Sequence, residues 1–93
     1  ERAYKAEPGN AGTADTLAMI LVERGEVRRG VELLQKAVSA APGVPAIRYH
    51  YAQALMKAGE RGRAKTELQQ VVNSTIQFPE KAEATRLLAQ LQE

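Results

Sequence analysis

The chain has 93 residues, 44% of them apolar and 26% charged, and its formal net charge at pH 7 is +2. These values are typical of one small globular domain and are too apolar for a disordered linker. The absence of cysteine excludes disulfides and thiolate metal sites, and the even balance of acids and bases argues against nucleic acid as a partner. The sequence contains no apolar run long enough to span a membrane, and its composition leaves the compartment open.

The first half of the chain predicts two antiparallel helices. Apolar residues recur at helical spacing over residues 11–24, where Asn10 and Thr13 are candidate N-caps, and again over residues 27–41. Gly25 separates the two stripes and can adopt the left-handed conformation that ends a helix. The second helix is therefore expected to fold back on the first, and a proline-rich turn ends it.

The second half repeats the same pattern. Helices are expected over about residues 46–58 and 62–73, with a turn at Gly59, followed by an exit that is three residues longer than the first one. A last amphipathic segment over residues 79–92 has Pro79 in a position that suits the first helical turn. We expect this segment to close the stack by covering the open flank of the second hairpin.

The strongest pattern is a repeat with a shift of 34 residues. The matching positions are mostly small or apolar. The pairs are Pro8 and Pro42, Ala18 and Ala52, Leu21 and Leu55, Gly25 and Gly59, Leu34 and Leu68, and Val38 and Val72. A period of this length predicts a helical solenoid, in which each hairpin buries its apolar face on the next. The predicted units are the end of a truncated preceding repeat (1–10), two full repeats (11–44 and 45–78) and a capping helix (79–93).

At these positions the sequence resembles the tetratricopeptide repeat (TPR) family, whose units place large residues at positions 7, 11 and 24, small ones at 8, 20 and 27, and proline at 32. Counted from Ala11, the first unit has Leu17, Ala18, Leu21, Gly30, Leu34, Ala37 and Pro42 there. Counted from Pro45, the second has Tyr51, Ala52, Leu55, Ala64, Leu68 and Val71. The resemblance implies an all-α fold of helix hairpins in a right-handed superhelix. The family's aromatic at position 4 is replaced by Ala14 and Arg48, which is expected to loosen that edge of each hairpin.

The family resemblance also implies a binding face. In TPR proteins the first helix of each unit lines a concave groove that takes an extended peptide or a partner helix. Transferred by position, the groove residues are Asp15, Thr16, Met19, Val22 and Glu23 in the first unit, and Tyr49, His50, Gln53, Met56 and Lys57 in the second, with Arg86 and Gln90 on the capping helix. The alternative is that these side chains are merely solvated or cover a neighbouring repeat.

Catalytic and metal sites are not expected. His50 is the only histidine, and a lone imidazole lacks the ligands that a metal site needs, since the single aspartate, Asp15, belongs to the other repeat. The sequence has no phosphate-binding loop, nucleophile elbow or Cys/His pair, so neither a cofactor nor an enzymatic activity is predicted. In TPR domains that clamp the C-terminal carboxylate of chaperones, the clamp is made by Lys, Asn and Arg. The matching positions here hold Asp15, Met19, His50, Glu83 and Leu87, so this clamp is not expected.

A row of bases near the hairpin turns suggests a second, less favoured surface. Arg24, Arg28 and Arg29 are echoed by Lys57, Arg61, Arg63 and Lys65, and such a rim could bind an anionic polymer. Interleaved glutamates favour an ordinary mixed surface instead, and no aromatic residue is present among the bases for stacking.

Three stretches, over residues 16–22, 47–52 and 78–84, are also similar to the C-terminal repeats of a bacterial TPR protein encoded beside exosortase and PEP-CTERM sorting systems. This narrower resemblance implies a periplasmic or envelope-associated, exopolysaccharide-linked protein.

The sequence as a whole predicts a scaffold that binds a protein or peptide partner. The alternatives are a structural spacer or a self-associating repeat, with an exposed apolar flank at Val27 and Leu33 as the source of a homodimer.

Overall fold

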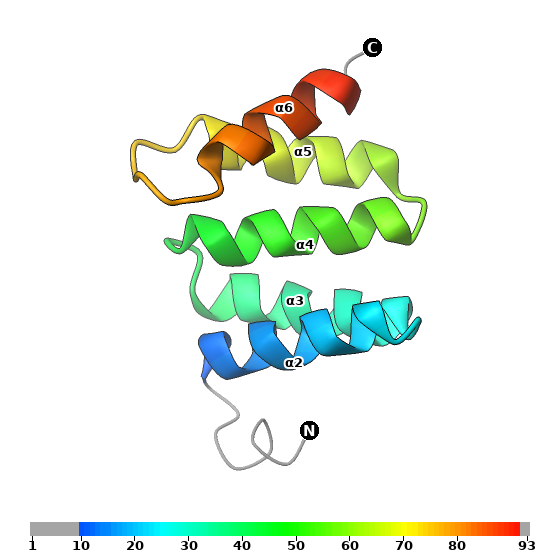
Figure 1. Ribbon diagram of the computed structural model, residues 1–93. Coiled ribbons are helices and arrows are strands. Elements are labelled where there is room, and N and C mark those ends of the chain that lie inside the picture. The colour runs from blue at the N-terminus through cyan, green and yellow to red at the C-terminus, as the bar shows by residue number, and fades with distance from the viewer. Residues whose placement is uncertain (1–9, 92–93) are drawn as a thin grey trace.

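The computed structural model describes residues 10–91, and within them the chain forms helices joined by short turns (Figure 1). The helices are α2 (Ala11–Glu23), α3 (Val27–Ala40), α4 (Pro45–Lys57), α5 (Arg61–Val72) and α6 (Lys81–Leu91). Figure 1 shows them stacked in chain order from α2 to α6, with the connecting turns at alternating ends of the stack. No strand occurs between residues 10 and 91, so the all-α fold is confirmed. The predicted end of a preceding repeat falls almost entirely on residues 1–9, outside the described part of the chain.

The helix boundaries follow from local chemistry. Asn10 caps α2, because its side-chain oxygen accepts a hydrogen bond of 2.8 Å from the backbone N–H of Thr13. Gly25 and Gly59 have φ angles of 91° and 83°, the left-handed region that ends a helix without a Cβ clash. Both glycines therefore turn the chain back and produce the antiparallel hairpins α2–α3 and α4–α5.

The last helix begins later than predicted. α6 starts at Lys81, and Pro79 lies in the preceding turn, which is closed by a 3.2 Å hydrogen bond from the N–H of Lys81 to the carbonyl of Phe78. The fixed φ of proline suits the second position of this turn, and the first bond of the helical ladder runs from the N–H of Ala84 to the carbonyl of Glu80, so the helix begins after Pro79.

Small residues set the distance between helices within each hairpin. Ala18, Ala52 and Ala64 are completely buried, and Gly30 is buried opposite Ala18 and Val22. A Cβ built on Gly30 would lie 2.4 Å from Cγ2 of Val22 and 2.9 Å from the carbonyl oxygen of Ala18. The first hairpin is therefore packed so closely that only glycine fits at this position.

Two apolar clusters hold the stack together, and α4 contributes to both. The first cluster joins α2, α3, α4 and the start of α5 through residues such as Val22, Leu34, Tyr51 and Ala64. The second joins α4, α5 and α6 through Tyr49, Ala52, Leu68, Val71, Ala84 and Leu88. The expected role of the closing helix is thus confirmed, because Ala84 and Leu88 of α6 cover the flank of the second hairpin.

One edge of the second hairpin differs from expectation. Arg48 occupies the position where the family carries an aromatic residue, and its guanidinium donates a hydrogen bond of 2.6 Å to the carboxylate of Glu67 on α5. The two side chains are only 17% and 19% exposed. A partly buried ion pair therefore links α4 and α5 at an edge that was expected to be loose.

Candidate functional site

The predicted binding face is formed by the first helix of each hairpin and by the closing helix. We call it the first-helix face, and it comprises Asp15, Thr16, Met19 and Glu23 of α2, His50, Gln53, Met56 and Lys57 of α4, and Arg86 and Gln90 of α6. Of these residues, five are exposed: Thr16, Glu23, Lys57, Arg86 and Gln90. The other side chains are half-buried, so the face remains open to solvent along its length.

Asp15 and His50 meet across the junction between the two hairpins. Nδ1 of His50 lies 2.9 Å from each of the two carboxylate oxygens of Asp15, and the side chains are 24% and 15% exposed. The hydrogen bond with Asp15 is the main reason that the pKa of His50 is raised above its ordinary value. The pair links α2 to α4 and is strongest when the imidazole is charged.

This pairing was missed at the level of sequence, although the repeat contains a signal for it. Asp15 and His50 are 35 residues apart, which is one period plus one residue. The equivalent pair one period later is Tyr49 and Ala84, and both of these residues lie in the second apolar cluster. Neighbouring first helices thus meet through the same two positions, once with polar and once with apolar side chains.

Two residues expected on the open face are buried, which corrects the prediction for them. Tyr49 is 6% exposed and packs in the cluster that includes Ala84 and Leu88 of α6. Its hydroxyl accepts a 3.2 Å hydrogen bond from Gln53, and burial, followed by the charge of Glu83, raises its pKa. Val22 is 3% exposed, because its side chain fills the space beside Gly30. Both side chains support the face from beneath and offer almost no contact surface.

The accessible centre of the first-helix face is soft and weakly polar. Met19 and Met56 are half-buried and pack against the first apolar cluster, while Gln53 lies one helical turn from Met56 on α4. Thioether side chains adapt their shape to different apolar partners, and an amide can pair with a peptide backbone. This arrangement can hold apolar anchors without demanding a single partner shape.

Two equivalent arginines of the basic rim form ion pairs with neighbouring glutamates. Arg29 binds Glu26 at 2.8 Å, and the equivalent Arg63 binds Glu60 at 2.9 Å. Arg63 also donates a 2.6 Å hydrogen bond to the hydroxyl of Tyr51, whose ring it approaches at 6.0 Å. These contacts fit the mixed surface that the interleaved glutamates predicted.

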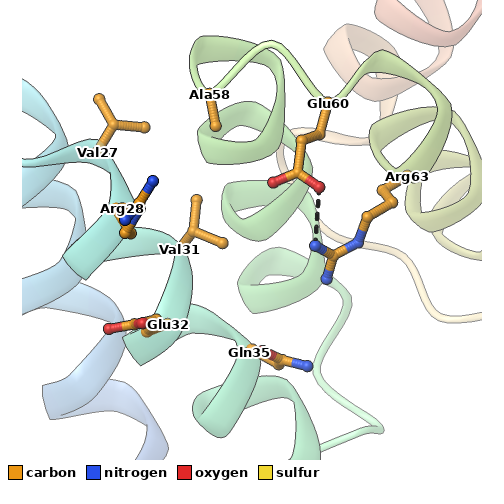
Figure 2. A pocket seen from close by; sticks show the side chains of 8 residues that line it. All are labelled: Val27, Arg28, Val31, Glu32, Gln35, Ala58, Glu60 and Arg63. Carbon is orange, nitrogen blue, oxygen red and sulfur yellow. Dashed lines mark hydrogen bonds and ion pairs between the residues drawn. The ribbon is translucent and has the colours of Figure 1, made fainter.

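A hollow of about 460 Å³ lies between α3 and the turn that joins α4 to α5 (Figure 2). Val27 and Val31 of α3 and Ala58 form its apolar part. Its charged lining is balanced, since Arg28 and Glu32 line the α3 side and the Glu60–Arg63 pair lines the other. The hollow thus has no net charge with which to select an ionic ligand.

Two further kinds of site were sought among the described residues, a metal site and a membrane-spanning helix. No group of three or more His, Cys, Asp or Glu side chains in residues 10–91 could hold a metal ion. Within the same residues, no helix has the length and apolarity needed to cross a membrane.

Comparison with known proteins agrees with the arrangement of hairpins. A family model described as "Tetratricopeptide repeat" matches residues 21–91, which is most of the chain. No curated protein matches the sequence.

Proposed function

Because the chain belongs to the tetratricopeptide repeat family, a family of typically non-catalytic modules that mediate protein–protein interactions, we propose that its first-helix face binds an extended peptide segment of a partner protein. The observation that carries the proposal is the open row of Met19, Gln53 and Met56 across α2 and α4. These side chains are accessible, although two of them are apolar and rest on the core.

The composition of the face indicates what the peptide looks like. Its accessible centre is methionine and glutamine, so apolar side chains of the peptide are the anchors. Charged residues lie toward the margins, where Glu23 and Lys57 at the ends of α2 and α4 are both exposed. The charges therefore fix the direction of the peptide more than they add to its affinity.

Selection from a displayed library of random peptides tests this proposal without a known partner. Peptides enriched on the native chain are measured against Met56→Glu, and against Gln69→Glu as a matched control on the exposed side of α5. We expect Met56→Glu to weaken binding about tenfold or more, because it places a charge where an apolar anchor is buried, and Gln69→Glu to change it less than about twofold.

A second variant separates loss of binding from loss of folding. Thr16 is exposed, so Thr16→Trp leaves the core intact and places a bulky ring on the first-helix face. Peptide binding that survives both Thr16→Trp and Met56→Glu, in proteins with native circular dichroism, contradicts the proposal.

We also propose that the partner belongs to a bacterial envelope or export assembly linked to exopolysaccharide. The support is the resemblance of residues 16–22, 47–52 and 78–84 to repeats encoded beside exosortase systems. Fractionation of the source cells with an antibody to this chain is expected to find it in the envelope or periplasm. Recovery from the cytoplasm alone contradicts this placement and leaves the peptide-binding proposal untouched.

A further inference from the structure

The imidazole of His50 has one ring nitrogen engaged and one open to solvent on the first-helix face. Nδ1 lies 2.9 Å from each carboxylate oxygen of Asp15, whereas Nε2 makes no hydrogen bond within residues 10–91. The side chain is 24% exposed, and the one buried side-chain polar atom without a partner in this part of the chain is Oε1 of Glu80. Nε2 is therefore accessible to a ligand on the face.

Asp15 determines what Nε2 can do. A carboxylate only accepts hydrogen bonds, so the proton of the neutral ring is on Nδ1 and Nε2 carries a lone pair. When the ring gains its second proton, Nε2 becomes a donor as well. The same atom is thus an acceptor in the neutral ring and a donor in the charged ring, while Asp15 holds the ring in one orientation.

The groups around the ring favour its charged form. The pKa of His50 is raised mainly by the hydrogen bond with Asp15; partial burial acts in the opposite direction, and the charges of Asp15 on α2 and of Glu80 before α6 add to the rise. Tyr49 lies beside the ring on α4, but its own pKa is raised and it stays neutral where histidine titrates. The charged groups of α6 that act on Tyr49 are Glu83 and Arg86. In mildly acidic solution Nε2 is therefore a donor.

The same charges select the kind of group that Nε2 can bind. The charged imidazole has two carboxylates, Asp15 and Glu80, as its charged neighbours, so the group as a whole remains negative. A carboxylate of the ligand is repelled there, whereas a neutral carbonyl oxygen is accepted. An extended peptide carries such an oxygen at every residue, and Met19, one helical turn from Asp15 on α2, offers a contact for an adjacent apolar side chain.

We propose that the Asp15–His50 pair controls peptide binding through the proton of His50: Nε2 of the charged ring donates a hydrogen bond to a backbone carbonyl of the peptide, and the neutral ring turns a lone pair toward that oxygen. The first-helix face then holds its peptide in mildly acidic solution and releases it as the ring loses its proton. Asp15 is a positioning residue, because it contacts the ring and not the peptide. This inference rests on the proposed function, the binding of an extended peptide at the same face.

Selection of peptides at two pH values tests the proposal. A displayed library of random peptides without histidine or cysteine is selected on the intact chain at about pH 5.5 and, separately, at about pH 9, which bracket the titration of a histidine with a raised pKa. The enriched peptides are synthesised with blocked ends, so that no terminal group titrates. We expect peptides from the acidic selection to bind the native chain about tenfold or more weakly at about pH 9. Gln69→Glu, on the exposed side of α5, is the control and should keep this pH dependence within about twofold.

Variants of the pair distinguish a donor from a purely structural contact. His50→Gln supplies an amide donor that does not titrate, and His50→Leu supplies none. We expect His50→Gln to bind within about twofold at both pH values, and more tightly than the native chain at about pH 9, while His50→Leu binds weakly at both. Asp15→Asn should move the midpoint of the pH dependence to lower pH, because it removes the charge that favours the imidazolium. Circular dichroism checks that each variant is folded.

The outcomes separate this inference from the proposed function. Equal affinity of the native chain at the two pH values, or tighter binding at about pH 9, would overturn the inference and leave peptide binding at this face intact. Binding by His50→Gln that is as weak as binding by His50→Leu would also overturn it, because the pair would then act only through the junction between α2 and α4. Recovery of no peptide in either selection would remove the proposed function itself, and the inference with it.

Discussion

At the scale of single residues, the contact between Gly30 and Val22 controls how closely the first hairpin packs. A Cβ on Gly30 would lie 2.4 Å from a methyl carbon of Val22, and that side chain is stiff because it is branched at Cβ. One repeat later the same two positions hold Ala64 and Met56. The flexible methionine makes room for the alanine methyl, so glycine is needed only where valine is the neighbour.

Gly30→Ala is therefore predicted to destabilise the protein even though alanine favours helix. Overpacking costs about 1–3 kcal/mol, and the better helix propensity offsets about 1 kcal/mol of it, so a net loss of about 1 kcal/mol is expected in urea unfolding. Gly62→Ala is the control, because a Cβ on Gly62 has no neighbouring atom within 4 Å and the change should be neutral or stabilising. The double variant Val22→Met with Gly30→Ala imports the pair from the second repeat and should recover part of the loss. Equal effects of Gly30→Ala and Gly62→Ala would contradict this account.

At the scale of helices, the link between α2 and α4 depends on the charge of one imidazole. The pKa of His50 is raised, first by the hydrogen bond with Asp15 and further by the charges of Asp15 and Glu80, while partial burial acts in the opposite direction. Tyr49 packs beside it with ring centroids 6.0 Å apart, and its own pKa is raised. Because the folded state holds the proton of His50 more tightly than the unfolded state, the stabilisation is complete below the unfolded pKa and is lost as pH rises through the folded one.

The resulting prediction is that the unfolding free energy decreases as pH rises above about 6.5, the ordinary pKa of histidine, and stops decreasing once pH exceeds the raised pKa of His50. His50 is the only histidine in the sequence, so no other imidazole contributes. Asp15→Asn keeps the size of the side chain but removes its charge, and it should flatten this part of the stability profile. It should also lower the pKa of His50 measured from its ring protons. An unchanged profile in Asp15→Asn would show that the pair does not stabilise the junction.

The helices and their stacking were predictable from the sequence because they depend on local signals and on the period. Gly25 and Gly59 mark the turns, and buried alanines such as Ala18 and Ala52 recur at the expected interval. The start of α6 was predicted at Pro79, whereas the helix begins at Lys81. A proline is compatible both with the first turn of a helix and with the turn that precedes it, so the sequence does not distinguish the two.

The site was less predictable, because it depends on contacts between units. Arg48 was interpreted as the replacement of an aromatic residue that would loosen the hairpin, yet it pairs with Glu67. The two residues are 19 positions apart, and no local sequence pattern indicates that they meet. Tyr49 was placed on the open face by its position in the repeat, but α6 buries it. The period determines which positions face the next unit, and the identity of the residue there decides whether the contact is an ion pair or an apolar one.

At the scale of the whole molecule, the helices are stabilised by packing against their neighbours in two apolar clusters. α4 and α5 contribute buried residues to both clusters, α5 through Ala64 in the first, whereas α2 and α3 belong only to the first and α6 belongs chiefly to the second. A stack of this kind behaves as a series of nearest-neighbour interactions, so a local defect is expected to loosen its own end first.

Leu88→Ala tests this behaviour, because Leu88 of α6 is 9% exposed and packs on the second cluster with Leu68 and Val71. Truncation of a buried leucine costs about 2–5 kcal/mol. We predict that amide hydrogen exchange then accelerates most in α6 and next in α5, and least in α2 and α3. Leu17→Ala, at a half-buried position of α2, serves as the control at the other end and should show the opposite gradient. Uniform acceleration along all helices in both variants would mean that the chain unfolds as a single unit, and the two clusters would then have no separate energetic meaning.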